Sequence, residues 1–211
     1  MSKVVNRLWG PLERWSPLVF LLAGALLAVA TVAIGFELFT SMDGLTSGPA
    51  GLAGFIGIAV SYFGLLGLYP RLVDRTPRLA RASVSLLLIP VVLIVVDVTA
   101  LVLNATPPMG QFGSAGFMTI LVLFAVGIAL AAIASLRTEV PSRSVGVALF
   151  VFALSWFGQV GAAQVYGFPI PDVPNGVFTG MMTLSLLAIG YLLLIEPEPS
   201  DRSKPASDSA V

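Results

Sequence analysis

Apolar residues follow one another in long runs along the chain, and short polar stretches separate these runs. Each run has about 20 residues, enough to cross a hydrocarbon core of about 30 Å as an α-helix. The runs lack the alternation of barrel strands, and a helix satisfies its backbone polar groups within its own segment. The pattern therefore predicts six transmembrane helices, at roughly 17–39, 51–70, 82–103, 116–136, 144–166 and 176–195.

The segments between the runs are short, which constrains the topology. Successive helices joined by short loops usually lie antiparallel and next to each other. We therefore expect an all-α membrane protein in which residues 17–195 form one bundle of six transmembrane helices, arranged as three antiparallel hairpins.

The two ends of the chain differ from the bundle. Residues 1–16 place apolar side chains, including two tryptophans, near one helical face, as an interfacial amphipathic segment does. Gly10-Pro11 is expected to break this segment. Residues 196–211 are rich in Pro, Ser and charge. Such a composition cannot bury enough apolar area to fold, so we expect a disordered tail.

Composition supports a membrane protein and excludes several kinds of chemistry. Of the 211 residues, 57% are hydrophobic and 10% are charged, whereas soluble domains carry about 25% charged residues. The chain contains neither cysteine nor histidine. Disulfides, thiolate metal sites, imidazole-bound haem and Ser-His catalysis are therefore excluded. With no P-loop and no paired intramembrane aspartates, we expect no enzyme, no cofactor and no metal site.

The positions of the basic residues predict the orientation. All eleven lie at the N-terminus, in the second and fourth loops or in the tail, and the loops near 40–50, 104–115 and 167–175 hold none. By the positive-inside rule, both termini are cytoplasmic in a multi-pass protein of the cell membrane. The arginines of the second loop could also contact anionic lipid headgroups, but orienting the protein is a sufficient role. The net charge of zero gives no reason to expect nucleic acid as a partner.

Small residues form stripes on two of the predicted helices. Lipid tails supply no hydrophobic drive between helices, so close backbone approach at small residues is a main source of association. The stripes therefore predict helix-packing seams, although the same glycines could permit sliding during a transport cycle. Their members are Gly54, Gly57, Ser61 and Gly64 in the second span, and Gly176, Gly180, Thr183 and Gly190 in the sixth.

One carboxylate, Asp97, interrupts the third run. It lies 16 residues after Arg81, about 24 Å along a straight helix, which places it in the outer leaflet. A charge near the bilayer centre costs about 2.5–3.5 kcal/mol, and no Lys or Arg is predicted on that side. Asp97 is therefore expected to be protonated, or to reach water or a cation from outside. Ser83, Pro90 and Asp97 recur every seven residues and share one stripe, with a helix kink expected at Pro90.

The fifth run offers a counterpart at the same predicted depth. Gln159 lies 16 residues after Arg143, and its amide could hydrogen-bond a protonated Asp97 directly. We therefore expect a polar pocket, open toward the exterior, where these two helices meet. Its expected lining is Asp97, Gln159, Ser155, Glu37 and Tyr166, with Gln164 extending it outward.

Two interpretations of this cluster remain open. The structural one is a hydrogen bond between neutral Asp97 and Gln159 that holds two helices together, worth about 0.6–2 kcal/mol. The functional one is a site that binds or moves a small solute, proton or cation, because intramembrane acids often mark such pathways. The structural interpretation suggests instead a non-catalytic accessory or scaffold subunit, whose partners are the lipid bilayer and other membrane subunits.

Overall fold

The computed structural model describes residues 3–40, 48–102, 108–167 and 170–196. Within them the chain forms seven helices and no strand, so the predicted all-α fold is confirmed. Apart from Glu196, the predicted tail lies outside the described residues. The helices are α1 (Lys3–Thr40), α2 (Pro49–Gly67), α3 (Tyr69–Val73), α4 (Pro77–Val102), α5 (Pro108–Thr138), α6 (Arg143–Tyr166) and α7 (Asp172–Ile195).

Five stretches among the described residues are long and apolar enough to cross a membrane. Large apolar side chains on their outer faces are exposed, such as Leu184 at 70% and Leu52 at 60%, and lipid tails can cover such faces. The chain is therefore a multi-pass membrane protein. The five stretches are Trp9–Phe39, Pro49–Val73, Met118–Thr138, Arg143–Tyr166 and Asp172–Ile195.

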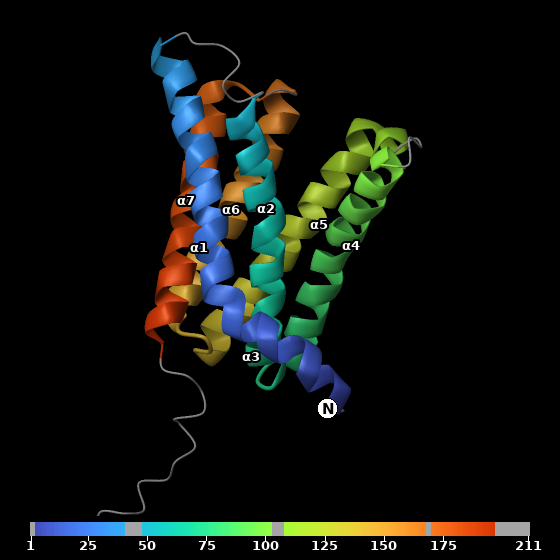
Figure 1. Ribbon diagram of the computed structural model, residues 1–211, viewed down its shortest axis with the longest axis vertical. Coiled ribbons are helices and arrows are strands. Elements are labelled where there is room, and N and C mark those ends of the chain that lie inside the picture. The colour runs from blue at the N-terminus through green and yellow to red at the C-terminus, as the bar shows by residue number, and fades with distance from the viewer. Residues whose placement is uncertain (1–2, 41–47, 103–107, 168–169, 197–211) are drawn as a thin grey trace, which may run out of the picture.

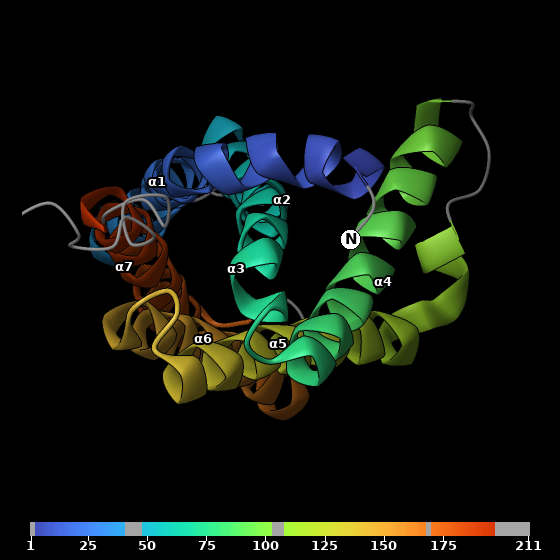
Figure 2. The same cartoon turned by 90° about the horizontal axis from the view of Figure 1, so that it is seen from below.

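The long helices run side by side and pack in the order α2, α1, α7, α6, α5, α4 (Figure 1). Seen from below, this order curves round, with α3 reaching toward its inside (Figure 2). Helix α4 packs on α5 along its length and touches α2 at few positions. The start of α1, the whole of α3 and the end of α7 lie at one end of the bundle, which we call the lower end. The opposite end, where α1 finishes and α2 and α7 begin, is the upper end.

Helix α1 continues through Gly10-Pro11, so the predicted break is wrong. A proline inside a helix removes one backbone hydrogen bond, which tertiary contacts can offset by allowing a bend. The first turns of α1 bend away from its long axis and cross the lower end of the bundle (Figures 1 and 2). They are held there partly by Trp9, whose ring centroid lies 5.0 Å from that of Tyr69 in α3.

The core contains an aromatic cluster that joins α2 to α5 and α6. Tyr62 of α2 stacks on Phe124 of α5, with ring centroids 4.2 Å apart. Trp156 of α6 meets Phe124 edge-on at 4.9 Å. All three side chains are buried, and each geometry is one that aromatic quadrupoles favour. Large rings therefore fill the space between α2 and the two helices opposite it.

Candidate functional site

Gln159, the predicted partner of Asp97, is hydrogen-bonded to α7. Its amide nitrogen Nε2 donates to Oδ1 of Asn175 at 3.1 Å and to Oγ1 of Thr179 at 3.3 Å. Thr179 Oγ1 also lies 3.4 Å from Asn175 Oδ1, to which it donates. Gln159 thus links the upper half of α6 to the first turns of α7.

These bonds continue as a polar string to α1. Thr183 lies one turn after Thr179 in α7, and its Oγ1 is 2.9 Å from Oγ1 of Thr31 in α1. Each hydroxyl is also 2.9 Å from a carbonyl oxygen of its own helix, at Thr179 and Leu27 respectively. Because a hydroxyl has a single hydrogen, one threonine donates across the interface while the other donates to its own helix. Three helices are therefore joined by neutral polar groups inside the membrane span.

The string could have been found in part from sequence spacing. Asn175, Thr179 and Thr183 recur every four residues and so share one face of α7. From the sequence, Thr183 was expected only as a small residue of a packing stripe, and Asn175 and Thr179 were not among the predicted site residues. Thr31 carries no such signal, because its partner lies 152 residues away in the chain.

Ser155 and Tyr166, two other residues of the predicted pocket, form no part of this string. Ser155 is fully buried, and its Oγ donates to the Val151 carbonyl oxygen of its own helix at 2.8 Å. Tyr166 is 62% exposed at the end of α6. Glu37 is half-buried near the upper end of α1. Of the predicted lining, Gln159 is a member of the string.

Asp97 belongs to α4, which continues as a helix past this position and through Pro90. The Asp97 side chain lies outside the described part of the structure. Lower in α4, Ser83 is buried and its Oγ donates to the Gly127 carbonyl oxygen of α5 at 2.8 Å. Because α5 lies between α4 and α6 in the packing order, the expected pairing of Asp97 with Gln159 receives no support from the arrangement of the helices.

The residues of the two predicted stripes lie where α1 meets α2 and α7. A Cβ atom at Gly57 of α2 would lie 2.9 Å from the Ala23 carbonyl oxygen, and one at Gly190 of α7 would lie 2.9 Å from the Pro17 carbonyl oxygen. Such distances leave no room for a side chain, so both helices approach the α1 backbone closely. Gly54, Gly64, Gly176 and Gly180 also face α1, and Ser61 is buried in α2 with its Oγ donating to the Ile58 carbonyl oxygen.

Two ion pairs of Arg71 connect helices at the lower end. Arg71 of α3 contacts Glu13 of α1, with Nε 3.2 Å from Oε1, and Glu196 after α7, with Nη1 3.7 Å from Oε2. Glu196 Oε1 also accepts a hydrogen bond of 2.6 Å from the backbone N–H of Ser142, which precedes α6. The Arg71 side chain is only 13% exposed. From the sequence, Arg71 was expected to orient the protein or to contact lipid headgroups, and this link between the ends of four helices was not predicted.

Trp156 carries a buried donor without a partner. Its indole Nε1–H has no hydrogen-bond acceptor among the described residues, although only 6% of the residue is exposed. Leaving such a group unpaired costs about 1–3 kcal/mol. Trp156 therefore contributes through the burial of its ring in the core, where it meets Phe124.

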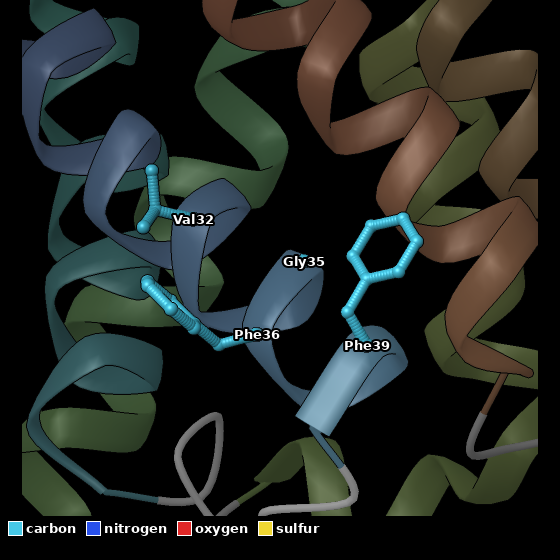
Figure 3. Close-up of a pocket in the computed structure, with 4 residues that line it drawn as sticks. All are labelled: Val32, Gly35, Phe36 and Phe39. Carbon is cyan, nitrogen blue, oxygen red and sulfur yellow. The ribbon is translucent and has the colours of Figure 1, made fainter.

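An open notch of about 250 Å³ lies on the surface of α1 toward its upper end. It is lined by Val32, Gly35, Phe36 and Phe39, and Figure 3 shows the two phenylalanine rings on either side of Gly35. Among the described residues, no polar side chain lines this notch. It suits an apolar chain and offers nothing to a cation or a polar solute.

Two further findings bear on function. In the part of the chain that the structure describes, no three carboxylates gather closely enough to hold a metal ion. Comparison of the chain with protein-family models, with curated proteins and with solved structures finds no match.

Proposed function

We propose that the chain is a six-helix protein of the cell membrane with both termini in the cytoplasm. The sixth span is α4, whose 26 residues measure about 39 Å as a helix, more than the hydrocarbon core requires. An even number of crossings agrees with the start of α1 and the end of α7 lying at the same end of the bundle (Figure 1). The arginines between α2 and α4, in the last turn of α5 and at the first position of α6 belong to that lower end, which the positive-inside rule assigns to the cytoplasm.

We propose further that the protein is a non-catalytic accessory or scaffold subunit of a membrane complex. The observation that carries this proposal is the use of the Gln159 amide, which donates to Asn175 and Thr179 of α7. An amide that serves a polar solute needs donors directed into an accessible cavity. Here both bonds of the Gln159 Nε2 atom join two helices, which is the structural role of an intramembrane polar group.

The remaining polar groups of the string support the same role. Thr31 and Thr183 bond each other across α1 and α7, and glycines bring the same two helices into close contact. The helices α1, α2, α6 and α7 thus form a tightly joined body whose outward faces are apolar. Such a body is suited to holding other membrane proteins by side-chain packing.

The test is isolation of the protein in a mild detergent from its native membrane. An accessory subunit should co-purify with a defined partner in fixed stoichiometry, and Asp97→Asn should leave that complex intact. Isolation of the protein alone from those membranes, together with a solute-dependent rise in its melting temperature, would contradict the proposal.

Binding of a small solute, proton or cation at Asp97 is a second candidate. The observation that favours it is the stripe on α4, since Ser83 and Pro90 are both buried and Asp97 follows Pro90 at the same spacing of seven. A site of this kind should give a solute-dependent melting temperature that Asp97→Asn abolishes and Gln159→Leu retains. A response that survives Asp97→Asn would rule it out.

A further inference from the structure

Three arginines lie together at the lower end, between α3 and the second turn of α4. Arg75 follows α3, and Arg78 and Arg81 belong to the first turns of α4. All three are exposed. We call this group the arginine corner.

Arg71 and Arg143 are held by carboxylates, whereas the arginine corner, like Arg14 and Arg137 at the same end, has no such partner in the described part of the chain. Within the described residues, none of its three guanidinium groups takes part in a salt bridge. Arg71, four residues before Arg75, is held by two carboxylates and is 13% exposed. Arg143 is paired with Glu139 at 2.9 Å. The guanidinium groups of the corner are therefore free to bind an external anion, whereas those of Arg71 and Arg143 already bind carboxylates.

The local backbone increases the positive potential of the corner. Arg78 and Arg81 are three residues apart in α4, so they are neighbours on the helix surface. The first turn of α4 contains no acidic residue, and the N-terminal end of a helix carries partial positive charge. Asp74, which is exposed at the end of α3, offsets one of the three charges and leaves an excess of two.

The depth of the corner fits the phosphates of a bilayer. The apolar span that begins at Pro49 ends at Val73, only two residues before Arg75. The aromatic contact of Trp9 with Tyr69 lies at the same end, and such rings mark the interface between hydrocarbon and water. Guanidinium groups bind phosphate oxygens in a bidentate manner, which an ammonium group cannot do.

We propose that the arginine corner binds the phosphate of an anionic phospholipid headgroup, with the acyl chains lying against the apolar faces of the bundle. The surface is distinct from the polar string and from Asp97, so it does not depend on the proposed function. Three exposed arginines at headgroup depth, beside a helix N-terminus whose first turn has no acidic residue, carry this inference.

The experiment compares lipid binding to matched variants. Phosphatidylglycerol or phosphatidylcholine is added to the purified full-length protein in detergent, and retained lipid is measured by native mass spectrometry. The wild type should retain phosphatidylglycerol in preference to phosphatidylcholine. Each arginine near an anionic surface contributes about fivefold in affinity, so the triple variant Arg75→Gln, Arg78→Gln, Arg81→Gln should bind phosphatidylglycerol on the order of a hundredfold more weakly.

The matched control removes the same number of charges from the same end of the protein. It is the triple variant Arg14→Gln, Arg137→Gln, Arg143→Gln, whose three residues are also exposed. This variant should lose far less affinity for phosphatidylglycerol. Equal losses in the two triples would show that net charge alone attracts the lipid, and unchanged binding in the corner triple would also overturn the proposal.

Two more measurements cover the remaining outcomes. Inorganic phosphate alone should not raise the melting temperature as phosphatidylglycerol does, and an equal rise would assign the corner to free phosphate. If the corner triple fails to insert or fold, the proposal is tested by the salt dependence of phosphatidylglycerol binding to the wild type. Retention of phosphatidylglycerol should fall as ionic strength rises, because salt screens exposed charges, and retention that ignores salt would contradict the proposal.

Discussion

Helix α2 packs in two different ways on its two sides. Toward α1 it presents glycines such as Gly57, and the two backbones come into direct contact. Toward α5 and α6 it presents Tyr62, and the space is filled by the stacked ring of Phe124 and the edge of Trp156. At the first interface the helices come close because side chains are absent, and at the second the volume of the side chains sets the distance between the helices. The two sides should therefore respond in opposite ways to larger and smaller substitutions.

The largest effect is expected on the aromatic side, from Phe124→Ala. Phe124 is fully buried between Tyr62 and Trp156, and removing its ring leaves a cavity. We expect a loss of about 3–5 kcal/mol in the free energy of unfolding, measured by denaturant titration in micelles. Phe63→Ala is the control, since Phe63 in α2 is 53% exposed. Similar losses in both variants would mean that the aromatic cluster adds nothing beyond lipid contact.

A smaller loss, caused by added volume rather than by removed volume, is expected where glycines meet α1, and α7 makes such a contact as α2 does. Gly190→Leu inserts a side chain where its Cβ would lie 2.9 Å from both the Pro17 carbonyl oxygen and the Leu21 backbone nitrogen. We expect a loss of about 1–3 kcal/mol in the same unfolding measurement, because backbone atoms cannot move aside cheaply.

Two further glycines sharpen this test. A Cβ at Gly64 would lie 3.0 Å from the Phe20 ring, a side chain that can shift, so Gly64→Leu should cost less than Gly190→Leu. A Cβ at Gly161 meets nothing within 4 Å, so Gly161→Leu should be tolerated. If all three variants behave alike, the close approach of α7 to α1 is not what stabilises the bundle.

The smallest effect is expected from the polar string. A double-mutant cycle with Thr31→Val and Thr183→Val isolates the bond between their hydroxyl groups. Hydrogen bonds between membrane helices contribute about 0.6 kcal/mol on average and at most about 1.7 kcal/mol. We expect a coupling energy in that range. A coupling energy of zero would show that these two helices associate through the glycines alone.

The features predicted correctly from the sequence are those that a single segment determines. A long apolar run in lipid must satisfy its backbone polar groups within its own segment, which a helix does. The all-α membrane class could therefore be predicted from the sequence. The expected break at Gly10-Pro11 was wrong because the contacts of Trp9 and Arg71 that support the bent start of α1 come from other helices.

The partner of each polar side chain depends on which helices become neighbours. The pairing of Gln159 with Asp97 was expected because both lie at the same depth, but depth does not specify direction. The amide nitrogen of Gln159 bonds α7, and the pairing with Asp97 stays a prediction. The partners of Arg71 were equally hard to predict, because a basic residue at the membrane surface can orient the protein, form an ion pair or do both. The spacing of Asn175, Thr179 and Thr183 was the best available sign that α7 had a polar face.

The most direct test of the account asks whether water reaches Gln159. Because the chain has no cysteine, Gln159→Cys and Gln164→Cys can each be labelled alone in intact cells with a membrane-impermeant maleimide. Gln164 is exposed near the end of α6, about 7.5 Å farther along the helix, and should react. If Gln159 holds α6 to α7 inside the membrane, its cysteine should stay unlabelled, whereas reaction of both cysteines at similar rates would reveal an aqueous cavity and contradict the account.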